Sequence, residues 1–215
     1  MPRLRKELVV AVCRTMPLGL VGAAGATGLL IAGLTRATGE AGAWLALPML
    51  RAAILASATG LVFLLDDPAR HTTATVPTSR PVRIGLRVAL VAPVAAAWWT
   101  VALLLVPGEL RPPVADITLE AGAALTLAVA GATAAVRFSE TARPGPRGAS
   151  ALLTSALLAL LFWPERWALF VPVGDERWGV AHDRWVMVLA VAVLVGGVCV
   201  VEPLRRWSWG VSRGR

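Results

Sequence analysis

Six long apolar runs dominate the sequence and constrain its fold more than any other feature. About 20 apolar residues are needed to cross the hydrocarbon core of a bilayer, and the runs come close to that length. Backbone groups in lipid must satisfy their own hydrogen bonds, so continuous apolar runs are expected to be helices. We therefore predict an all-α integral membrane protein with a single transmembrane domain, residues 1–215, and spans at residues 17–34, 43–65, 84–106, 117–136, 149–163 and 185–201.

The basic residues alternate between the stretches that separate these runs. Fifteen of the 21 Lys and Arg residues fall on one side of a membrane if the chain crosses it at every run. The stretches on that side are residues 3–14, 70–87, 137–147 and 205–215. Cytoplasmic loops carry such an excess of positive charge. This pattern predicts a multi-pass protein of the cell membrane with its N- and C-termini in the cytoplasm. An even number of spans likewise puts both termini on one side.

The composition agrees with a membrane location. The chain is 57% hydrophobic and only 16% charged, against roughly 25% charged residues in soluble domains. A net charge of +8 is compatible with nucleic-acid binding in general, but these basic residues lie in short loops rather than on one soluble face. Anionic lipid headgroups explain the charge better, so the predicted partner is the lipid membrane and no nucleic acid is expected.

Two segments outside the spans have two interpretations each. Residues 3–16 form an interfacial amphipathic helix in one interpretation and an irregular basic N-terminus in the other. Residues 164–172 follow the fifth span, and Pro164 and Pro172 bracket an apolar piece too short to cross a bilayer. This piece is interpreted either as a short re-entrant helix on the outer side or as a simple exposed loop.

The first span is rich in glycine, which lets helices approach closely in lipid. Its glycines are Gly19, Gly22, Gly25, Gly28 and Gly33. We expect this span to pack against a neighbouring helix of the same chain, with a seam between two copies as the alternative.

Two charged residues fall within predicted spans. Arg51 lies about eight residues into the second span, and Glu120 lies near the outer start of the fourth. Charge inside a membrane is a functional hint by default. We weigh two arrangements: the side chains snorkel to the interface, which we favour, or they form an Arg51–Glu120 pair or a polar outer vestibule.

Most catalytic constellations are missing from the sequence. His71 and His182 fall on opposite predicted sides, so they cannot share a metal ion within one chain. No Gly-rich loop ends in Gly-Lys-Ser/Thr, and Lys6 is the only lysine. We therefore expect no enzymatic activity and no cofactor in this chain.

The connection between the second and third spans has the most specific local sequence. It leaves the second span with Asp66 and Asp67, and Asp67 or Thr72 is placed to cap a short helix through Ala74. A turn follows at Pro77, Thr78 and Ser79, and Arg80, Arg83 and Arg87 open the third span.

This connection resembles the corresponding loop of the membrane subunits of ABC-2-type exporters. In that family the loop carries an acidic residue, a Gly/Thr-Leu-like stretch, a Pro-Val/Thr-Ser turn and a basic residue that opens the third span. It forms a coupling helix that docks on a separate ATPase subunit. The resemblance implies coupling roles for Asp66, Asp67, Thr72, Pro77, Thr78, Ser79, Arg80 and Arg83. A doubled aspartate stands here where the family usually has glutamate, and the family's Gly-Thr-Leu core is absent.

The layout of the chain is also similar to that family, which has an N-terminal interfacial helix, six spans and short outer helices before the last span. The resemblance implies a permease that works with a nucleotide-binding ATPase subunit, which holds the ATP and Mg²⁺, and with a second, identical or related six-helix subunit. The alternative is a non-transporting assembly or anchor protein whose cytoplasmic loops bind a partner. An ion-driven carrier is disfavoured because the spans lack mid-membrane acids and a visible internal repeat.

Overall fold

A computed structural model describes residues 13, 15–37, 42–66, 80–138, 144–162, 164 and 167–201. Its long helices are α2 (Leu18–Gly33), α3 (Gly42–Val62), α4 (Arg80–Leu105), α5 (Val114–Phe138), α6 (Gly145–Phe162) and α7 (Trp178–Val200). Single turns of 3₁₀ helix extend α2 and α3, namely η1 (Leu34–Arg36) and η3 (Phe63–Leu65), and η5 (Gly108–Leu110) joins α4 to α5. All six long helices are long and apolar enough to span a membrane, which confirms the predicted number of spans.

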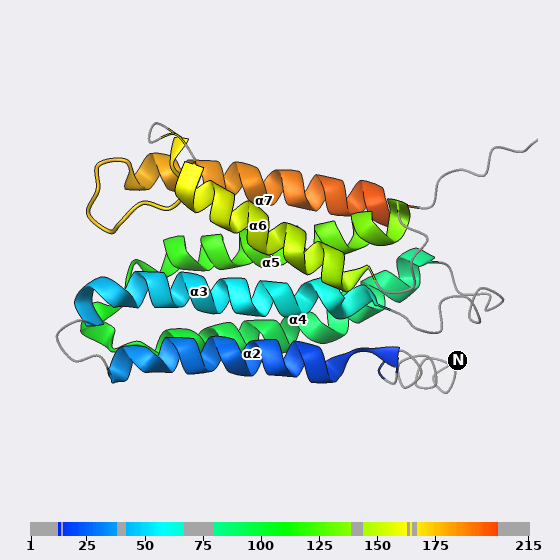
Figure 1. The fold of residues 1–215 in the computed structure, drawn as a ribbon, viewed down its shortest axis with the longest axis horizontal. Coiled ribbons are helices and arrows are strands. Elements are labelled where there is room, and N and C mark those ends of the chain that lie inside the picture. Colours follow the sequence, from blue (N-terminus) through cyan, green and yellow to red (C-terminus); the bar gives the residue numbers. More distant parts are fainter. Residues whose placement is uncertain are drawn as a thin grey trace, which may run out of the picture.

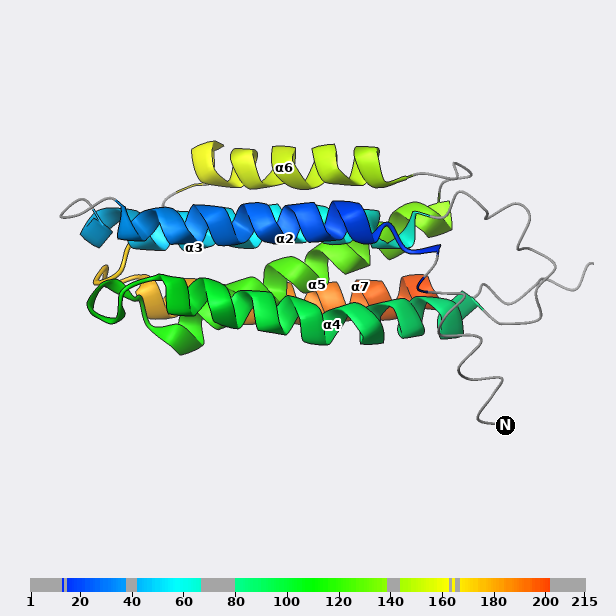
Figure 2. The ribbon, with the colours of Figure 1, turned by 90° about the horizontal axis from the view of Figure 1, so that it is seen from below.

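The helices lie side by side along one axis, and successive helices run in opposite directions (Figure 1). The start of α2, η3 and the end of α7 lie at one end of this bundle, which we call the termini end. The other end, with η1, η5 and residues 167–177, is the loop end. Seen from below, α6 lies on one side of α2 and α3, and α4 and α7 lie on the other (Figure 2). The charge pattern still predicts that the termini end faces the cytoplasm.

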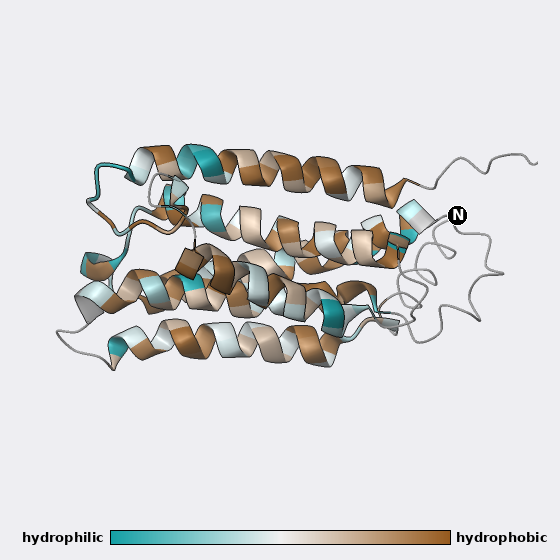
Figure 3. Ribbon diagram, turned by 45° about the horizontal axis from the view of Figure 1, so that its top comes forward, coloured by the Kyte–Doolittle hydropathy of each residue, from teal (hydrophilic) through white to brown (hydrophobic). Residues whose placement is uncertain are grey.

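The helix surfaces are apolar around most of their circumference, as a bilayer requires. Hydropathy changes along the bundle rather than around each helix, because the hydrophilic residues gather at the ends and in the connections (Figure 3). Most contacts between helices join α5 with α7, α2 with α3, and α3 with α5. Beyond Ala149, by contrast, α6 is mostly exposed, so its outer part depends on lipid or on another chain for cover.

Glycines of the first span do meet neighbouring helices of the same chain, as we expected. A Cβ atom added to Gly28 would lie 2.9 Å from the Ala53 carbonyl oxygen on α3. A Cβ atom on Gly25 would lie 2.5 Å from the Trp98 ring on α4. Gly19 and Gly22 instead face open space, so only one side of the glycine-rich surface is used within the chain.

Arginines cap the C-terminal ends of neighbouring helices. Arg36 donates to the Leu105 and Leu104 carbonyl oxygens at the end of α4, at 2.7 and 3.1 Å. Arg137 donates to the Val198 and Val201 carbonyl oxygens at the end of α7, at 2.5 and 2.8 Å. The last carbonyls of a helix have no partner inside it, and a cation there also complements the helix dipole. These arginines therefore hold neighbouring helices together.

Three predicted elements differ from the structure or lie outside it. The last span begins at Trp178 instead of near Trp185, because His182 and Arg184 lie within its first turns. Residues 168–173 are irregular, so the predicted re-entrant helix is wrong over these residues. The predicted interfacial helix at residues 3–16 falls almost entirely outside the described residues.

Candidate functional site

A buried ion pair lies at the loop end between α3 and α5. Arg51 donates from Nε to Glu120 Oε2 at 2.8 Å and from Nη2 to Oε1 at 2.6 Å. Only 2% of the Glu120 side chain and 16% of the Arg51 side chain are exposed. Two parallel bonds of this kind are the strongest geometry available to an arginine and a carboxylate. The structure therefore has the pair that we had weighed against snorkelling, and our preference for snorkelling was wrong.

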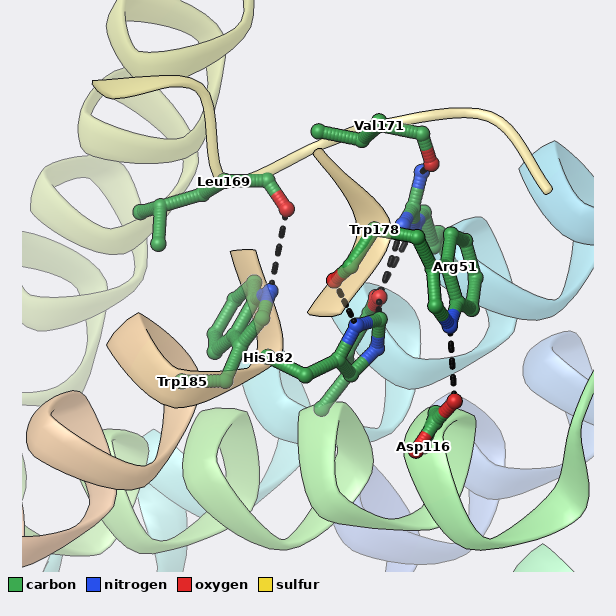
Figure 4. Close-up of polar contacts among 8 residues, drawn as sticks. Arg51, Asp116, Leu169, Val171, Trp178, His182 and Trp185 are labelled. Carbon is green, nitrogen blue, oxygen red and sulfur yellow. Dashed lines mark hydrogen bonds and ion pairs between the residues drawn. The ribbon is translucent and has the colours of Figure 1, made fainter. Parts of the chain in front are cut away.

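The first turns of α7 complete the site. His182 Nε2 lies 3.2 Å from Glu120 Oε1, and His182 Nδ1 lies 2.8 Å from the Trp178 carbonyl oxygen. The Trp178 and His182 rings are in contact, with their centroids 4.4 Å apart and their planes tilted by 39°. Trp178 Nε1 donates to Asp116 at 2.7 Å, one turn before Glu120 on α5 (Figure 4). We call Arg51, Asp116, Glu120, Trp178 and His182 the loop-end cluster.

Irregular backbone covers this cluster. Three side chains donate to carbonyl oxygens of residues 168–171: Arg184 to Ala168 at 2.9 Å, Trp185 to Leu169 at 3.0 Å and Arg51 to Val171 at 3.1 Å. Figure 4 shows the last two bonds beside the cluster. Irregular backbone at this depth is tolerated only where protein groups satisfy it. The cluster thus both buries charge and fixes the segment above it, which we call the cover, residues 167–173.

Aromatic rings of the cover add to this attachment. The Arg51 guanidinium lies 5.4 Å from the centroid of the Phe170 ring, and the Arg184 guanidinium lies 5.5 Å from that of Trp167. Both distances are within the range of cation–π attraction. Phe170 also meets the Trp185 ring edge-on, with centroids 5.6 Å apart. Arg51 therefore links the carboxylate below it to both the backbone and a ring of the cover.

An exposed turn connects the cover to α7. Arg177 donates to Asp175 from its backbone nitrogen at 2.8 Å and from its guanidinium at 3.0 and 2.9 Å. The hydrogen bonds from the Arg177 side chain and then from its backbone lower the pKa of Asp175 from 3.8 to about 2. Asp175 therefore stabilises this turn above its unfolded pKa, and that contribution is lost as pH falls towards 2.

Replacing Arg177 with alanine should raise the pKa of Asp175 towards its ordinary 3.8. The side-chain bonds disappear, whereas the weaker backbone bond remains, so the carboxylate gains a proton at a higher pH. Carboxyl ¹³C NMR of the aspartates during an acid titration measures this shift. The matched control is Glu176→Ala in the same turn, which should leave the Asp175 titration unchanged. An unshifted Asp175 in the Arg177 variant would contradict the assigned cause.

A second set of buried polar groups lies at the termini end. Asp66 Oδ1 accepts a hydrogen bond from the Gly145 backbone nitrogen at 2.8 Å. Arg87 donates to the Leu64 carbonyl oxygen at 3.3 Å and to Thr15 Oγ1 at 3.0 Å. Asp66 and Arg87 are 8% and 7% exposed. We call Thr15, Leu64, Asp66, Arg87 and Gly145 the termini-end cluster.

The termini-end cluster joins segments that are far apart in the sequence. It connects the segment before α2, the end of η3, the first part of α4 and the start of α6. A Cβ atom added to Gly145 would lie 2.5 Å from both Asp66 Oδ2 and Phe63 Cδ1, so the contact between η3 and α6 requires glycine. Asp66, which precedes the 67–79 connection, and α4, which follows it, are therefore both bonded to other elements of the bundle.

The candidate coupling residues are only partly within the described chain. Asp66 is buried in the termini-end cluster, and Arg83 lies half-buried on α4. The backbone of Arg80 begins α4. The remaining candidates, Asp67, Thr72, Pro77, Thr78 and Ser79, lie outside the described residues. Arg87, which we had placed only among the basic residues opening the third span, donates the two hydrogen bonds of the termini-end cluster given above.

Our reading of the sequence missed two members of the loop-end cluster. Asp116 precedes Glu120 by four residues, and Trp178 precedes His182 by four. Residues at this spacing share one face of a helix, so both pairs were visible as polar faces at the ends of α5 and α7. His182 was considered only as half of a two-histidine metal site.

Within the described residues, no group of three or more His, Cys, Asp or Glu side chains is placed to hold a metal ion.

Comparison of the chain with protein-family models, with curated proteins and with solved structures finds no match.

Proposed function

We propose that this multi-pass membrane protein is the permease subunit of an ATP-driven exporter of the ABC-2 type. In this proposal a separate ATPase subunit docks on the 67–79 connection at the cytoplasmic face and supplies the ATP and Mg²⁺. A second six-helix subunit, identical or related, completes the transporter. Asp67, Thr72, Pro77, Thr78, Ser79, Arg80 and Arg83 contribute to the docking surface, and Asp66 anchors it.

The observation that carries this proposal is the termini-end cluster. A docking loop transmits force only if its ends are fixed to the helices that must move. Asp66 fixes one end of the 67–79 connection to the start of α6, and Arg87 fixes the other end to η3 and to the segment before α2. A displacement of the connection would therefore reach α2, α4 and α6 together. An anchor protein that only binds a partner has no need for this arrangement.

The interior of the bundle favours a transport pathway between two subunits. A cavity among α2, α3, α4 and α5 has a volume of about 20 Å³ and is lined mainly by small and apolar residues with Trp98 and Trp99. That is room for little more than one water molecule. In this proposal the pathway for a hydrophobic or amphipathic substrate lies at the surface of the bundle, where a second subunit would close it.

Co-purification tests the proposal. The full chain with an affinity tag, extracted from its own membrane in a mild detergent, should bring down a subunit with a Gly-Lys-Ser/Thr nucleotide loop. Reconstituted in lipid vesicles, that subunit should hydrolyse ATP faster in the presence of this chain than alone. Recovery of the chain without any nucleotide-binding subunit would reject the exporter and leave the anchor or assembly protein.

Replacing Pro77, Thr78 and Arg80 together with alanine should reduce the stimulation of the ATPase to the rate of the ATPase alone. The turn and the first cation of α4 would no longer present a docking surface, whereas the buried residues of the termini-end cluster stay in place. Circular dichroism and thermal unfolding should match the unchanged chain. The control is Glu109→Ala, an exposed residue at the opposite end, which should retain full stimulation. Full stimulation by the triple variant would contradict the docking assignment.

A further inference from the structure

The imidazole of His182 has one nitrogen whose protonation is fixed by geometry. Its Nδ1 lies 2.8 Å from the Trp178 carbonyl oxygen. A carbonyl oxygen can only accept a hydrogen bond, so Nδ1 carries a proton. In a neutral imidazole the other nitrogen, Nε2, is then a bare acceptor.

That second nitrogen faces a carboxylate. Nε2 lies 3.2 Å from Glu120 Oε1 but has no hydrogen-bond partner among the described residues. His182 is only 7% exposed. A bare Nε2 would therefore leave a buried acceptor without a donor, and it would also place its lone pair against a carboxylate oxygen. Both arrangements are unfavourable. A proton on Nε2 converts the same contact into an ion pair.

We propose that Glu120 and His182 together form a proton-binding site that fastens the cover, residues 167–173, onto the loop end of the bundle. The proton comes from solvent, lies on Nε2 beside Glu120 Oε1, and returns to solvent when the site empties. Because the two groups are in contact, the proton belongs to the pair and not to either residue alone. This site lies at the opposite end from the proposed ATPase docking surface and does not depend on the proposed function.

The charged groups around the pair come from several elements. Arg51 on α3 holds both oxygens of Glu120, and Asp116 on α5 reaches the ring through Trp178. The cover itself has no titratable side chain. Other charged residues of neighbouring elements are Asp183 and Arg184 on α7, Asp175, Glu176 and Arg177 in the turn before it, Glu109 and Arg111 beside η5, and Arg83 and Arg87 at the far end of α4.

The link from the proton to the cover runs through Arg51. Its Nη1 donates to the Val171 carbonyl oxygen while Nε and Nη2 hold Glu120. If the proton leaves, Nε2 and Oε1 repel each other, and either Glu120 or the His182 ring must move. Movement of Glu120 shifts Arg51 away from Val171, and movement of the His182 ring disturbs its contact with the Trp178 ring. The cover should therefore be held firmly at low pH and loosen as pH rises.

Two measurements on the full chain in lipid nanodiscs test this proposal. The chain has two histidines, so His71→Gln leaves His182 as the only source of a ¹⁵N-histidine signal. A nitroxide attached to a cysteine at position 173, in a background with Cys13→Ser and Cys199→Ala, reports the mobility of the cover. Histidine ordinarily changes charge between about pH 5 and pH 8, which sets the range to be scanned.

We expect the ¹⁵N spectrum to change from imidazolium to neutral imidazole as pH rises, with Nδ1 still protonated in the neutral form. The mobility of the nitroxide should increase several-fold over the same range. His182→Gln should make the mobility independent of pH. Asp116→Asn retains an acceptor for Trp178 and should keep the pH response. A nitroxide at position 194, an exposed position on α7, should show no response.

Three results would overturn the proposal. The first is a His182 signal that remains neutral wherever the bundle is folded. The second is a nitroxide at position 173 whose mobility stays constant while His182 titrates. The third is a pH response that persists in the His182→Gln variant. If that variant does not fold, Glu120→Gln replaces it, and loss of the pH response is again required.

Discussion

Replacing Glu120 with alanine should destabilise the bundle by about 3–5 kcal/mol, the cost of leaving one partner of a buried ion pair without the other. The Arg51 guanidinium would lose two hydrogen bonds and remain mostly buried under the cover. His182 would lose its carboxylate neighbour as well. Unfolding by increasing amounts of SDS, followed by tryptophan fluorescence and circular dichroism, measures the change.

The double variant Arg51→Met, Glu120→Leu should recover most of that loss. Apolar residues of similar size are often as stable as the buried pair that they replace, and the two sites are in contact, so their effects should not add. Asp183→Ala, on the exposed side of α7, serves as the control and should change stability by less than about 0.5 kcal/mol. A cost below about 1 kcal/mol for the Glu120 variant would match an exposed pair and restore the snorkelling interpretation.

The number and position of the helices were predictable because each span is a continuous apolar run of about membrane thickness. The largest error is at α7, which begins at Trp178 instead of near Trp185. Hydropathy treats His182 and Arg184 as breaks in an apolar run. In the structure both residues are helical. The His182 ring contacts Glu120 and the Arg184 guanidinium donates to the Ala168 carbonyl oxygen, so the helix continues through these two polar residues.

The pairing of Arg51 with Glu120 was foreseen only as one of two arrangements. The two residues are far apart in the sequence, and which spans are neighbours is not set by hydropathy when helices are apolar all round. Snorkelling was favoured because both residues lie in the same outer half of their spans. The cover favours the ion pair over snorkelling, because the backbone of residues 168–171 lies over Arg51 and its Val171 carbonyl oxygen accepts a hydrogen bond from Arg51. No periodic signal in that irregular segment predicts this fold-back.

Helix neighbours are better specified by small residues than by hydropathy, and α2 with α3 is the clearest case. A Cβ atom added to Gly60 on α3 would overlap the Ala24 side chain and lie 3.5 Å from the Val21 Cα atom. A Cβ atom on Gly28 would lie 3.0 Å from Ser57 Oγ, in addition to its contact with Ala53. In lipid, close packing of this kind is what holds two helices together.

Gly60→Val should therefore cost about 1–3 kcal/mol, the usual penalty for overpacking an interface that cannot yield. The obstacle is the backbone and the first side-chain carbon of α2 rather than the flexible end of a long side chain, so the two helices must separate. Gly28→Val meets the Ala53 backbone and should cost a similar amount. SDS unfolding gives the stability, and a disulfide trap between cysteines placed on α2 and α3 would report their separation.

The matched control is Gly22→Val on the same helix, where the added side chain meets no atom of the chain within 4 Å. Valine is a better helix former than glycine, so this variant should be as stable as the unchanged chain or slightly more so. Equal losses for Gly22→Val and Gly60→Val would mean that glycine serves the flexibility of the helices and not their contact. A large loss of stability for Gly22→Val alone, seen only when two copies of the chain associate, would indicate a different contact. The glycine-rich surface of α2 would then pack against a second subunit through the side that carries Gly22.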